Sequence, residues 1–190
     1  MISVEVLRWI FKRAKQKDLL MFFQVFEQYK TFANLTTPVR IAGFLSQIGH
    51  ETNQFLWLSE LASGQAYEGR KDLGNIKLGD GKRFKGRGYI QLTGRSNYQA
   101  FQEWVIKNQK AIFDEQQEPI PNFIQNPELI ATHRWAMLSA IFFWQNKKMN
   151  QYADAMDIKQ MTKIVNGGLK GFEERKQYWN VALHELGVKV

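Results

Sequence analysis

A cluster of seven glycines is the feature that most constrains the fold of this chain of 190 residues. The glycines stand at positions 64, 69, 74, 79, 81, 86 and 88, and the segments on either side have the apolar spacing of helices. Glycine is unfavourable inside helices and strands, but it lets the backbone turn tightly or approach a ligand closely. We therefore predict a loop-rich centre between two helical regions.

The helical regions are predicted from apolar residues at three- and four-residue spacing and from capping signals. Thr37 followed by Pro38 is typical of a helix start, and the helix that follows ends near Glu51. Asp157 is a candidate cap for a later helix, which Gly167 and Gly168 would terminate. The expected helices cover residues 1–33, 38–51, 97–110, 128–147, 157–166 and 172–186.

A short β element is expected in the glycine-rich centre. Residues 89–93 alternate in polarity, with Tyr89, Gln91 and Thr93 on one face, and residues 83–85 are a candidate partner. The polar face is either that of an ordinary amphipathic strand or part of a sugar-binding groove. The predicted fold class is therefore mainly α (α+β), with a small β-hairpin near residues 82–93.

The composition limits the domain organisation and the chemistry. A hydrophobic content of 44% supports a real core, and 190 residues suit one domain. We expect a single domain over 1–190, with an N-terminal helical segment at 1–35 and a catalytic core at 36–190. Cysteine is absent and the three histidines are widely separated, so we predict no metal and no cofactor.

The net charge of +8 suits an anionic partner such as nucleic acid, a membrane face or an acidic cell-wall polymer. A basic protein without any polyanionic target has the same charge. The lysines and arginines are dispersed and no nucleic-acid motif occurs, so we expect no nucleic-acid partner.

Glu51 is the first candidate for chemistry. It shares the apolar side of its predicted helix with Phe44 and Ile48, and it lies at the negative end of the helix dipole. Both effects favour the neutral carboxylic acid, which is the form that a general acid needs. The alternative is a solvated glutamate at a frayed helix end. Cleavage of a glycosidic bond usually needs a second carboxylate on the other side of that bond. The candidates are Glu60, Glu68, Asp72 and Asp80.

Several segments, taken in order, resemble glycoside hydrolase family 19, the lysozyme-like family of plant chitinases and of many phage and bacterial cell-wall lysins. The resemblance covers roughly residues 38 to 185. It is carried by the segments IAGFLSQIGHET at 41–52, YEGR at 67–70, GDG at 79–81, FKGRGYIQLTGR at 84–95, NPEL at 126–129 and VNGG at 165–168, followed by Arg175.

The resemblance implies catalytic roles for three residues. Glu51 matches the general acid, and Thr93 matches the hydroxyl residue that helps to hold the attacking water. Glu60 is assigned as the base, with Glu68 as its rival, because the segment after Glu60 departs from the lysin pattern. The family inverts the anomeric centre, for which the two carboxyl groups need a separation of about 6.5–9.5 Å.

The resemblance also implies a set of substrate-binding side chains. Arg175 would steady the catalytic carboxylates, and Gln91, Asn97 and Asn166 match polar residues of the substrate cleft. The full set of candidate substrate-binding residues comprises Tyr67, Arg70, Tyr89, Gln91, Asn97, Asn166 and Arg175.

The expected function is that of a peptidoglycan-degrading endolysin of the muramidase type. We find no convincing signal peptide and no separate chitin-binding domain, and the charge suits an anionic envelope. Synthesis in the cytoplasm, release through a holin or a secretion apparatus, transient envelope contact and a monomeric state are expected. The alternatives are a chitinase, a secreted antibacterial effector with the same chemistry, and a binding protein that keeps the fold without the activity.

Overall fold

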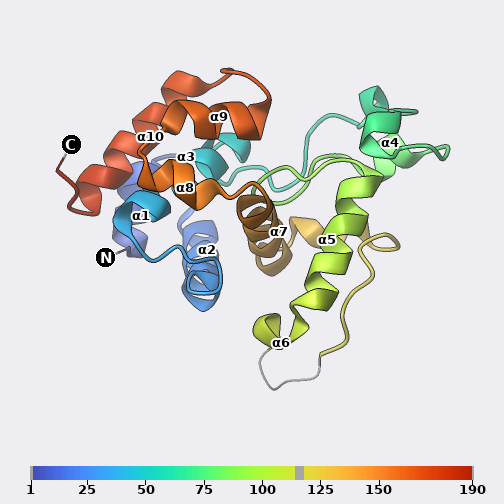
Figure 1. Ribbon diagram of the computed structural model, residues 1–190, viewed down its shortest axis with the longest axis horizontal. Helices are drawn as coiled ribbons and strands as arrows, with labels where there is room; N and C mark the ends of the chain where they lie inside the picture. Colours follow the sequence, from blue (N-terminus) through green and yellow to red (C-terminus); the bar gives the residue numbers. More distant parts are fainter. Residues whose placement is uncertain (1, 114–117, 190) are drawn as a thin grey trace. The chain divides into compact units, whose positions relative to one another are not determined.

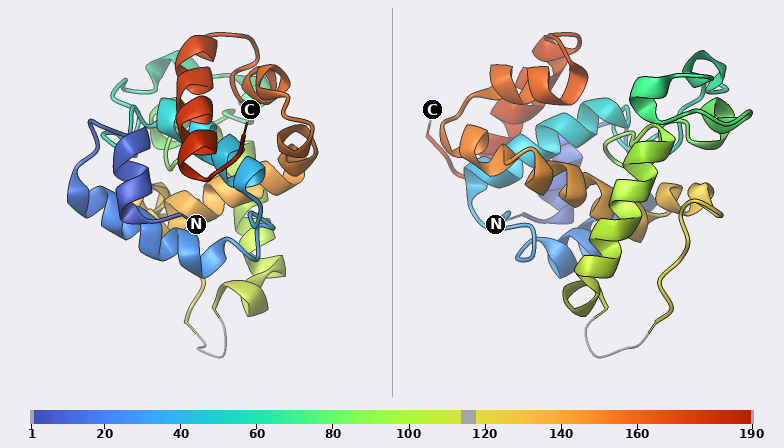
Figure 2. Two further views of the ribbon diagram at one scale, coloured as in Figure 1. Left: turned by 90° about the vertical axis from the view of Figure 1, so that its left-hand side faces the viewer. Right: turned by 45° about the vertical axis from the view of Figure 1, so that its right-hand side comes forward.

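The protein is mainly helical, as the sequence predicts (Figures 1 and 2). The computed structural model describes residues 2–113 and 118–189. The chain forms two compact units, one of Met1–Trp57 with Phe143–Val190 and one of Leu58–Phe142. Helix α7, His133–Asn146, contributes residues to both units. A single catalytic domain over 1–190 stays a prediction.

The first unit is built around helix α3, whose residues 41–49 are all buried. Helix α3 packs against α8, α9 and α10, and α10 also contacts α1 (Figure 2). Its helices are α1 (Val4–Ile10), α2 (Gln16–Tyr29), α3 (Pro38–Glu51), α8 (Met149–Asp154), α9 (Ile158–Asn166) and α10 (Phe172–Glu185).

Aromatic side chains form much of the core of this unit. Phe11, which follows α1, lies edge-on to Phe55 with the ring centroids 4.9 Å apart, and Phe44 lies edge-on to Trp144 at 5.3 Å. The Phe11 ring also packs against α3 at Gly49, where a Cβ would lie only 2.3 Å from the ring. The N-terminal helices therefore contribute to the core instead of forming a detached arm.

Helix ends in this unit follow the predicted capping signals. The Thr37 side chain accepts a hydrogen bond from the backbone N–H of Arg40 at the start of α3. The Asp157 side chain accepts one from Gln160 N at 2.8 Å at the start of α9. Gly167, with φ of 74°, ends α9 in the left-handed conformation that glycine adopts without steric cost. These predicted boundaries are confirmed.

The second unit combines short helices with the glycine-rich loops. Its core includes Phe84, Tyr98, Phe101 and Phe123, all fully buried. Its elements besides α7 are η1 (Gln65–Tyr67), η2 (Lys71–Leu73), α4 (Asp80–Arg83), α5 (Arg95–Lys107), α6 (Gln109–Ile112) and η3 (Pro127–Ala131).

The predicted β-hairpin near residues 82–93 is wrong. The described part of the second unit has only two isolated β-bridges, Ser59 with Arg87 and Arg87 with Leu92. Gln91 has φ of 53°, which breaks the alternation of an extended strand. The Arg87 guanidinium donates to the carbonyl of Arg83 and to the Tyr98 hydroxyl, so it holds this segment as a compact loop.

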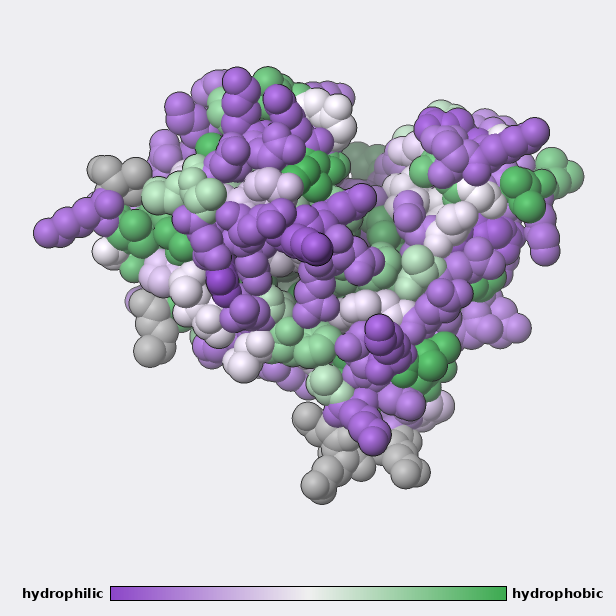
Figure 3. Space-filling view, in the orientation of Figure 1, coloured by the Kyte–Doolittle hydropathy of each residue, from purple (hydrophilic) through white to green (hydrophobic). Residues whose placement is uncertain are grey.

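No helix among the described residues is long and apolar enough to cross a membrane. Hydrophilic residues predominate on the face shown in Figure 3, and hydrophobic residues appear there in small separate groups.

Candidate active site

Glu51 is the last residue of α3, and it is held by an arginine of α10. Arg175 donates from Nη2 to Glu51 Oε1. The arginine side chain is fully buried, whereas 19% of the Glu51 side chain is exposed. The ion pair fixes the orientation of the Glu51 carboxyl group, while part of the side chain stays exposed.

Arg175 is positioned in turn by a residue that the sequence analysis did not single out. The buried side chain of Gln47, one turn before Glu51 on α3, accepts from Arg175 Nη1 at 2.8 Å. Gln47 Nε2 donates to Ser46 Oγ at 3.1 Å. Arg175 Nε is buried without a hydrogen-bond partner among the described residues. Such an unpaired buried donor is unusual in folded proteins and marks this arginine as part of a polar site.

A chain of hydrogen bonds fixes the residues on both sides of Glu51. His50 Nδ1 contacts Glu174, whose other oxygen accepts from the Tyr178 hydroxyl at 2.7 Å, and Gln54 Nε2 donates to that hydroxyl at 3.0 Å. Burial opposes ionisation of Glu174, but the hydrogen bonds from Tyr178 and His50 outweigh it and lower its pKa. Burial and the bond to Glu174 raise the pKa of Tyr178, which therefore remains a donor. The backbone that carries Glu51 is thus tied to α10.

Glu60, in the second unit, has a carboxylate that is bound on both oxygens. Oε1 accepts from the Tyr67 hydroxyl at 3.0 Å, and Oε2 accepts from the backbone N–H of Gly86 at 3.1 Å. The backbone N–H of Glu60 also donates to the Gly86 carbonyl at 2.8 Å. Burial and the bond to Glu60 raise the pKa of Tyr67, so the phenol stays protonated and donates. The two donors hold the Glu60 carboxylate in a fixed orientation.

Three polar side chains of the second unit converge above Gly86. A Cβ at this glycine would lie 2.9 Å from Gln91 Oε1, 3.3 Å from Glu60 Oε2 and 3.3 Å from Thr93 Oγ1. Thr93 Oγ1 donates to the carbonyl of Gln91 at 2.8 Å. A side chain at position 86 would displace these groups, so glycine lets a carboxylate, an amide and a hydroxyl lie together against the backbone. Glu60, Gln91 and Thr93, which are predicted site residues, thus lie together in the structure.

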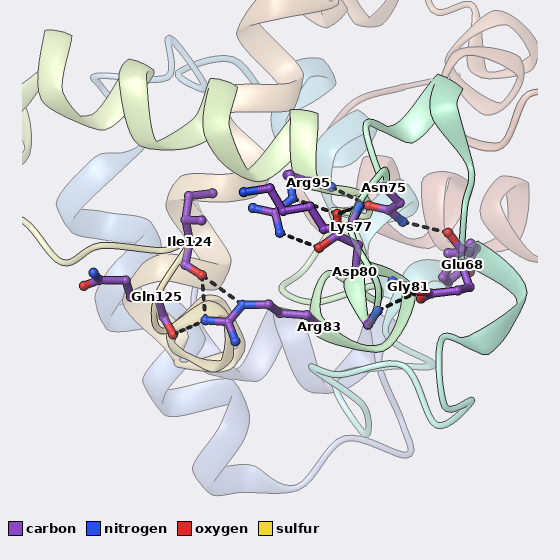
Figure 4. A network of polar contacts seen from close by, with 11 residues as sticks. Glu68, Asn75, Lys77, Asp80, Gly81, Arg83, Arg95, Ile124 and Gln125 are labelled. Carbon is purple, nitrogen blue, oxygen red and sulfur yellow. Dashed lines mark hydrogen bonds and ion pairs between the residues drawn. The ribbon is translucent and has the colours of Figure 1, made fainter.

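Glu68, the rival of Glu60, has a different environment. Its two oxygens accept from the backbone N–H groups of Gly79 at 2.6 Å and Gly81 at 2.8 Å, at the start of α4 (Figure 4). A carboxylate bound to the first amides of a helix stabilises that helix. This arrangement gives Glu68 a structural task and favours Glu60 as the base.

A buried ion pair supports the loop that carries Tyr67 (Figure 4). The Asp80 carboxylate, only 1% exposed, is bound by the Arg95 guanidinium and accepts from the backbone N–H of Lys77 at 3.0 Å. The Arg95 backbone N–H donates to Asn75 Oδ1 at 2.9 Å, and Asn75 Nδ2 donates to the Tyr67 carbonyl at 2.9 Å. The hydrogen bond from Arg95 lowers the pKa of Asp80. Asp80 is therefore engaged in the scaffold of the loop.

The remaining predicted binding residues have varied environments. Tyr89 is fully buried and its hydroxyl bonds to His133 Nδ1 at 2.8 Å, so its predicted place on a groove face is wrong. Arg70 is exposed and paired with Asp72. Asn97, also exposed, donates to the Thr93 carbonyl at 2.7 Å. Asn166 is exposed at the end of α9 in the first unit. Binding roles for Arg70, Asn97 and Asn166 stay predictions.

No group of three or more histidine, aspartate or glutamate side chains in the described parts of the chain is arranged to hold a metal ion.

Comparisons with known proteins agree with the predicted resemblance. No protein-family model matches the sequence. A protein of Haemophilus influenzae described as a glycosyl hydrolase family 19 domain-containing protein is 26% identical over 174 residues, covering 75% of this chain and 78% of that protein.

Solved structures with a similar fold are chitinases. Chitinase C from Streptomyces griseus has a TM-score of 0.73 at 18% identity. The similarity covers 99% of this chain and 93% of the chitinase chain. A bacterial family 19 chitinase has a TM-score of 0.70 at 16% identity, over 99% and 96% of the two chains. A class IV chitinase from Zea mays has a TM-score of 0.68 at 20% identity, over 99% and 94%.

The fold, together with the sequence similarity, defines the class of the protein as a glycosidase. Its resemblance is to glycoside hydrolase family 19, whose lysozyme-like, mainly helical fold it shares.

Proposed function

We propose that this glycosidase cleaves β-1,4 bonds between the amino sugars of peptidoglycan, as a muramidase-type endolysin that lyses bacterial cells. The observation that carries the proposal is the convergence of Glu60, Gln91 and Thr93 above Gly86. A carboxylate, an amide oxygen and a hydroxyl are the groups needed to hold and deprotonate a water molecule.

In the proposed reaction Glu51 is the acid and Glu60 is the base. Glu51 donates its proton to the bridging oxygen as the bond to the anomeric carbon breaks. A water held by Thr93 and Glu60 attacks that carbon from the opposite face, and its proton passes to Glu60, so the configuration inverts. The hydrogen bond from Tyr67 holds the Glu60 carboxylate in position for this step. Arg175 steadies the Glu51 carboxylate once its proton has left.

Charge favours peptidoglycan over chitin as the substrate. The chain carries a net charge of +8, and peptidoglycan carries carboxylate groups on its stem peptides, whereas chitin is neutral. The solved structures with a similar fold are named as chitinases, so chitin is the alternative substrate. We further propose that the enzyme acts on the cell wall after release through a holin or a secretion apparatus, the latter route being that of an antibacterial effector.

Digestion of two substrates with one inactive variant tests the proposal. We expect the wild type to release new reducing ends from purified peptidoglycan, and mass spectrometry should find muramic acid at those ends. Replacing Glu51 by Gln keeps the shape but removes the proton donor, so the rate should fall by about 10²–10⁴-fold. Glu103→Gln, at an exposed position of α5, is the matched control and should keep the wild-type rate.

Three outcomes would contradict parts of the proposal. Near-normal digestion by Glu51→Gln would remove Glu51 as the acid. Glucosamine at the new reducing ends would indicate a glucosaminidase. Activity on soluble chitin oligomers without activity on peptidoglycan would make the chain a chitinase.

A further inference from the structure

A cavity of about 500 Å³ lies in the first unit, formed by α1, the link that follows it and the start of α2. Glu51 and the residues above Gly86 do not line it. Its volume is within the range of small-molecule sites, about 300–1,000 Å³. Its lining residues are Glu5, Arg8, Trp9, Phe11, Lys12, Ala14 and Gln16.

The chemistry of the lining suits a sugar with acidic groups. Trp9 is 62% exposed, an unusual position for so large an apolar ring. An exposed indole face packs well against the apolar C–H face of a pyranose ring, while hydroxyl and amide groups at the ring edge stay available for hydrogen bonds. Glu5 and Gln16 supply acceptors at the same cavity, and Arg8 and Lys12 supply two cations for carboxylates.

The charged side chains of the cavity are available to a ligand. Glu5, Arg8 and Lys12 are exposed, and none of them forms an ion pair with any described residue. Binding an anionic sugar polymer here would not require an existing ion pair to break. A ligand would therefore meet two unpaired cations beside an aromatic ring.

The same surface is poorly suited to a membrane. An interfacial helix needs a continuous exposed apolar face, but the other large apolar residues of α1, Leu7 and Ile10, are buried in the unit. Trp9 is thus the one large hydrophobic side chain that α1 exposes.

We propose that this cavity is an auxiliary glycan site that binds peptidoglycan strands by stacking on Trp9 and by pairing Arg8 and Lys12 with stem-peptide carboxylates. The inference rests on the proposed function. The site holds the enzyme on the insoluble polymer between cleavage events and so raises the effective concentration of the substrate. It contributes nothing to the hydrolysis of short oligomers that cannot reach it.

Co-sedimentation with purified peptidoglycan sacculi tests the site. Each variant is made in the Glu51→Gln background, so that the sacculi stay intact during binding. Trp9→Ala should weaken retention about tenfold, the scale of losing an aromatic anchor. The double variant Arg8→Gln with Lys12→Gln should weaken it at low salt, with less effect at high salt. With Glu51 restored, Trp9→Ala should slow digestion of sacculi but leave the rate on short soluble oligomers unchanged.

Matched controls separate this site from general changes in charge or hydrophobicity. Leu78→Ala removes a fully exposed apolar side chain in the other unit, and Lys107→Gln with Lys110→Gln removes two exposed cations there. Both should bind sacculi like the parent. If Trp9→Ala lowers the folded fraction measured by circular dichroism, the sacculus binding of the double variant Arg8→Gln with Lys12→Gln decides whether the site exists.

The failure of this inference differs from the failure of the proposed function. If the wild type digests sacculi but Trp9→Ala binds them as well as Leu78→Ala does, the auxiliary site is wrong and the function stands. If Trp9→Ala loses binding to vesicles of anionic lipid but still binds sacculi like the parent, Trp9 contacts a membrane instead. If the wild type neither digests nor binds sacculi, both proposals fail together.

Discussion

Two aspartate–arginine pairs of the second unit share one geometry but differ in burial, which makes them a controlled test of what an ion pair contributes to stability. In each pair the Nε and Nη2 groups of the arginine bind the two carboxylate oxygens. The side chains of Asp80 and Arg95 are 1% and 14% exposed, whereas those of Asp72 and Arg70 are 60% and 51% exposed. We predict that Asp80→Asn is strongly destabilising and that Asp72→Asn is not.

The magnitude follows from burial. Asp80→Asn keeps the shape of the side chain but leaves the Arg95 guanidinium against a neutral amide. Breaking a fully buried pair costs about 3–5 kcal/mol, and a hydrogen bond to a charged group is worth about 1.5–3 kcal/mol. Because Arg95 keeps some contact with water, we expect the free energy of unfolding to fall by about 3 kcal/mol. For a chain of this size that lowers Tm by about 6–12 °C.

The penalty should also depend on pH. The hydrogen bond from Arg95 lowers the pKa of Asp80 in the folded state, so the pair stabilises the fold above the ordinary aspartate pKa of about 3.9. This contribution is lost as the pH falls from that value through the lower folded pKa. The difference in stability between wild type and Asp80→Asn should therefore shrink below about pH 4.

Calorimetry and urea unfolding measure the stability of the two variants, and hydrogen exchange measures local opening of the second unit. Asp72→Asn should have a Tm within error of the wild type, because exposed ion pairs are screened and hold two mobile side chains. A fall of less than about 1 kcal/mol in the free energy of unfolding of Asp80→Asn at pH 7 would contradict this prediction. Equal destabilisation of the two variants would contradict it as well.

Three further substitutions test the proposed roles. Tyr67→Phe removes a hydrogen bond to Glu60 and should lower kcat about tenfold without changing the fold, as measured on soluble oligomers; an unchanged kcat would mean that the hydroxyl does not act on the base. Glu68→Gln should lower Tm but keep the activity, because the Glu68 carboxylate holds the start of α4. Loss of activity in this variant would make Glu68 the base again. Gly171→Ala should cost about 2 kcal/mol or more, because φ is +72° and the new Cβ would lie 2.1 Å from the His50 ring; calorimetry would contradict this with an unchanged Tm.

The helices were predictable because they depend on local signals. The apolar spacing and the caps at Thr37 and Asp157 act within a few residues, and the structure confirms the helices that they begin. The loop at residues 84–93 was not predictable in the same way. Its alternating residues fit a strand, but the Arg87 guanidinium, bound to Tyr98 eleven residues further on, holds it in another conformation.

Partners distant in the sequence explain the other gaps. The contact of Gln47 with Arg175 joins residues 128 positions apart, and nothing near Gln47 in the sequence indicates it. Glu60 and Glu68 are both glutamates of one loop-rich segment, so residue type alone does not separate them. Their different donors, a tyrosine for Glu60 and helix amides for Glu68, appear only when the loops are folded.

The contact of Phe11 with Gly49 has a consequence for anyone who wishes to shorten or transplant this enzyme. A truncation at residue 35 would look harmless from the sequence resemblance, which begins near residue 38. It would nevertheless remove the ring that fills the space beside Gly49, two residues before Glu51. A chimaera built from this chain must therefore carry the first two helices with the catalytic segment, and new modules belong before α1, not in its place.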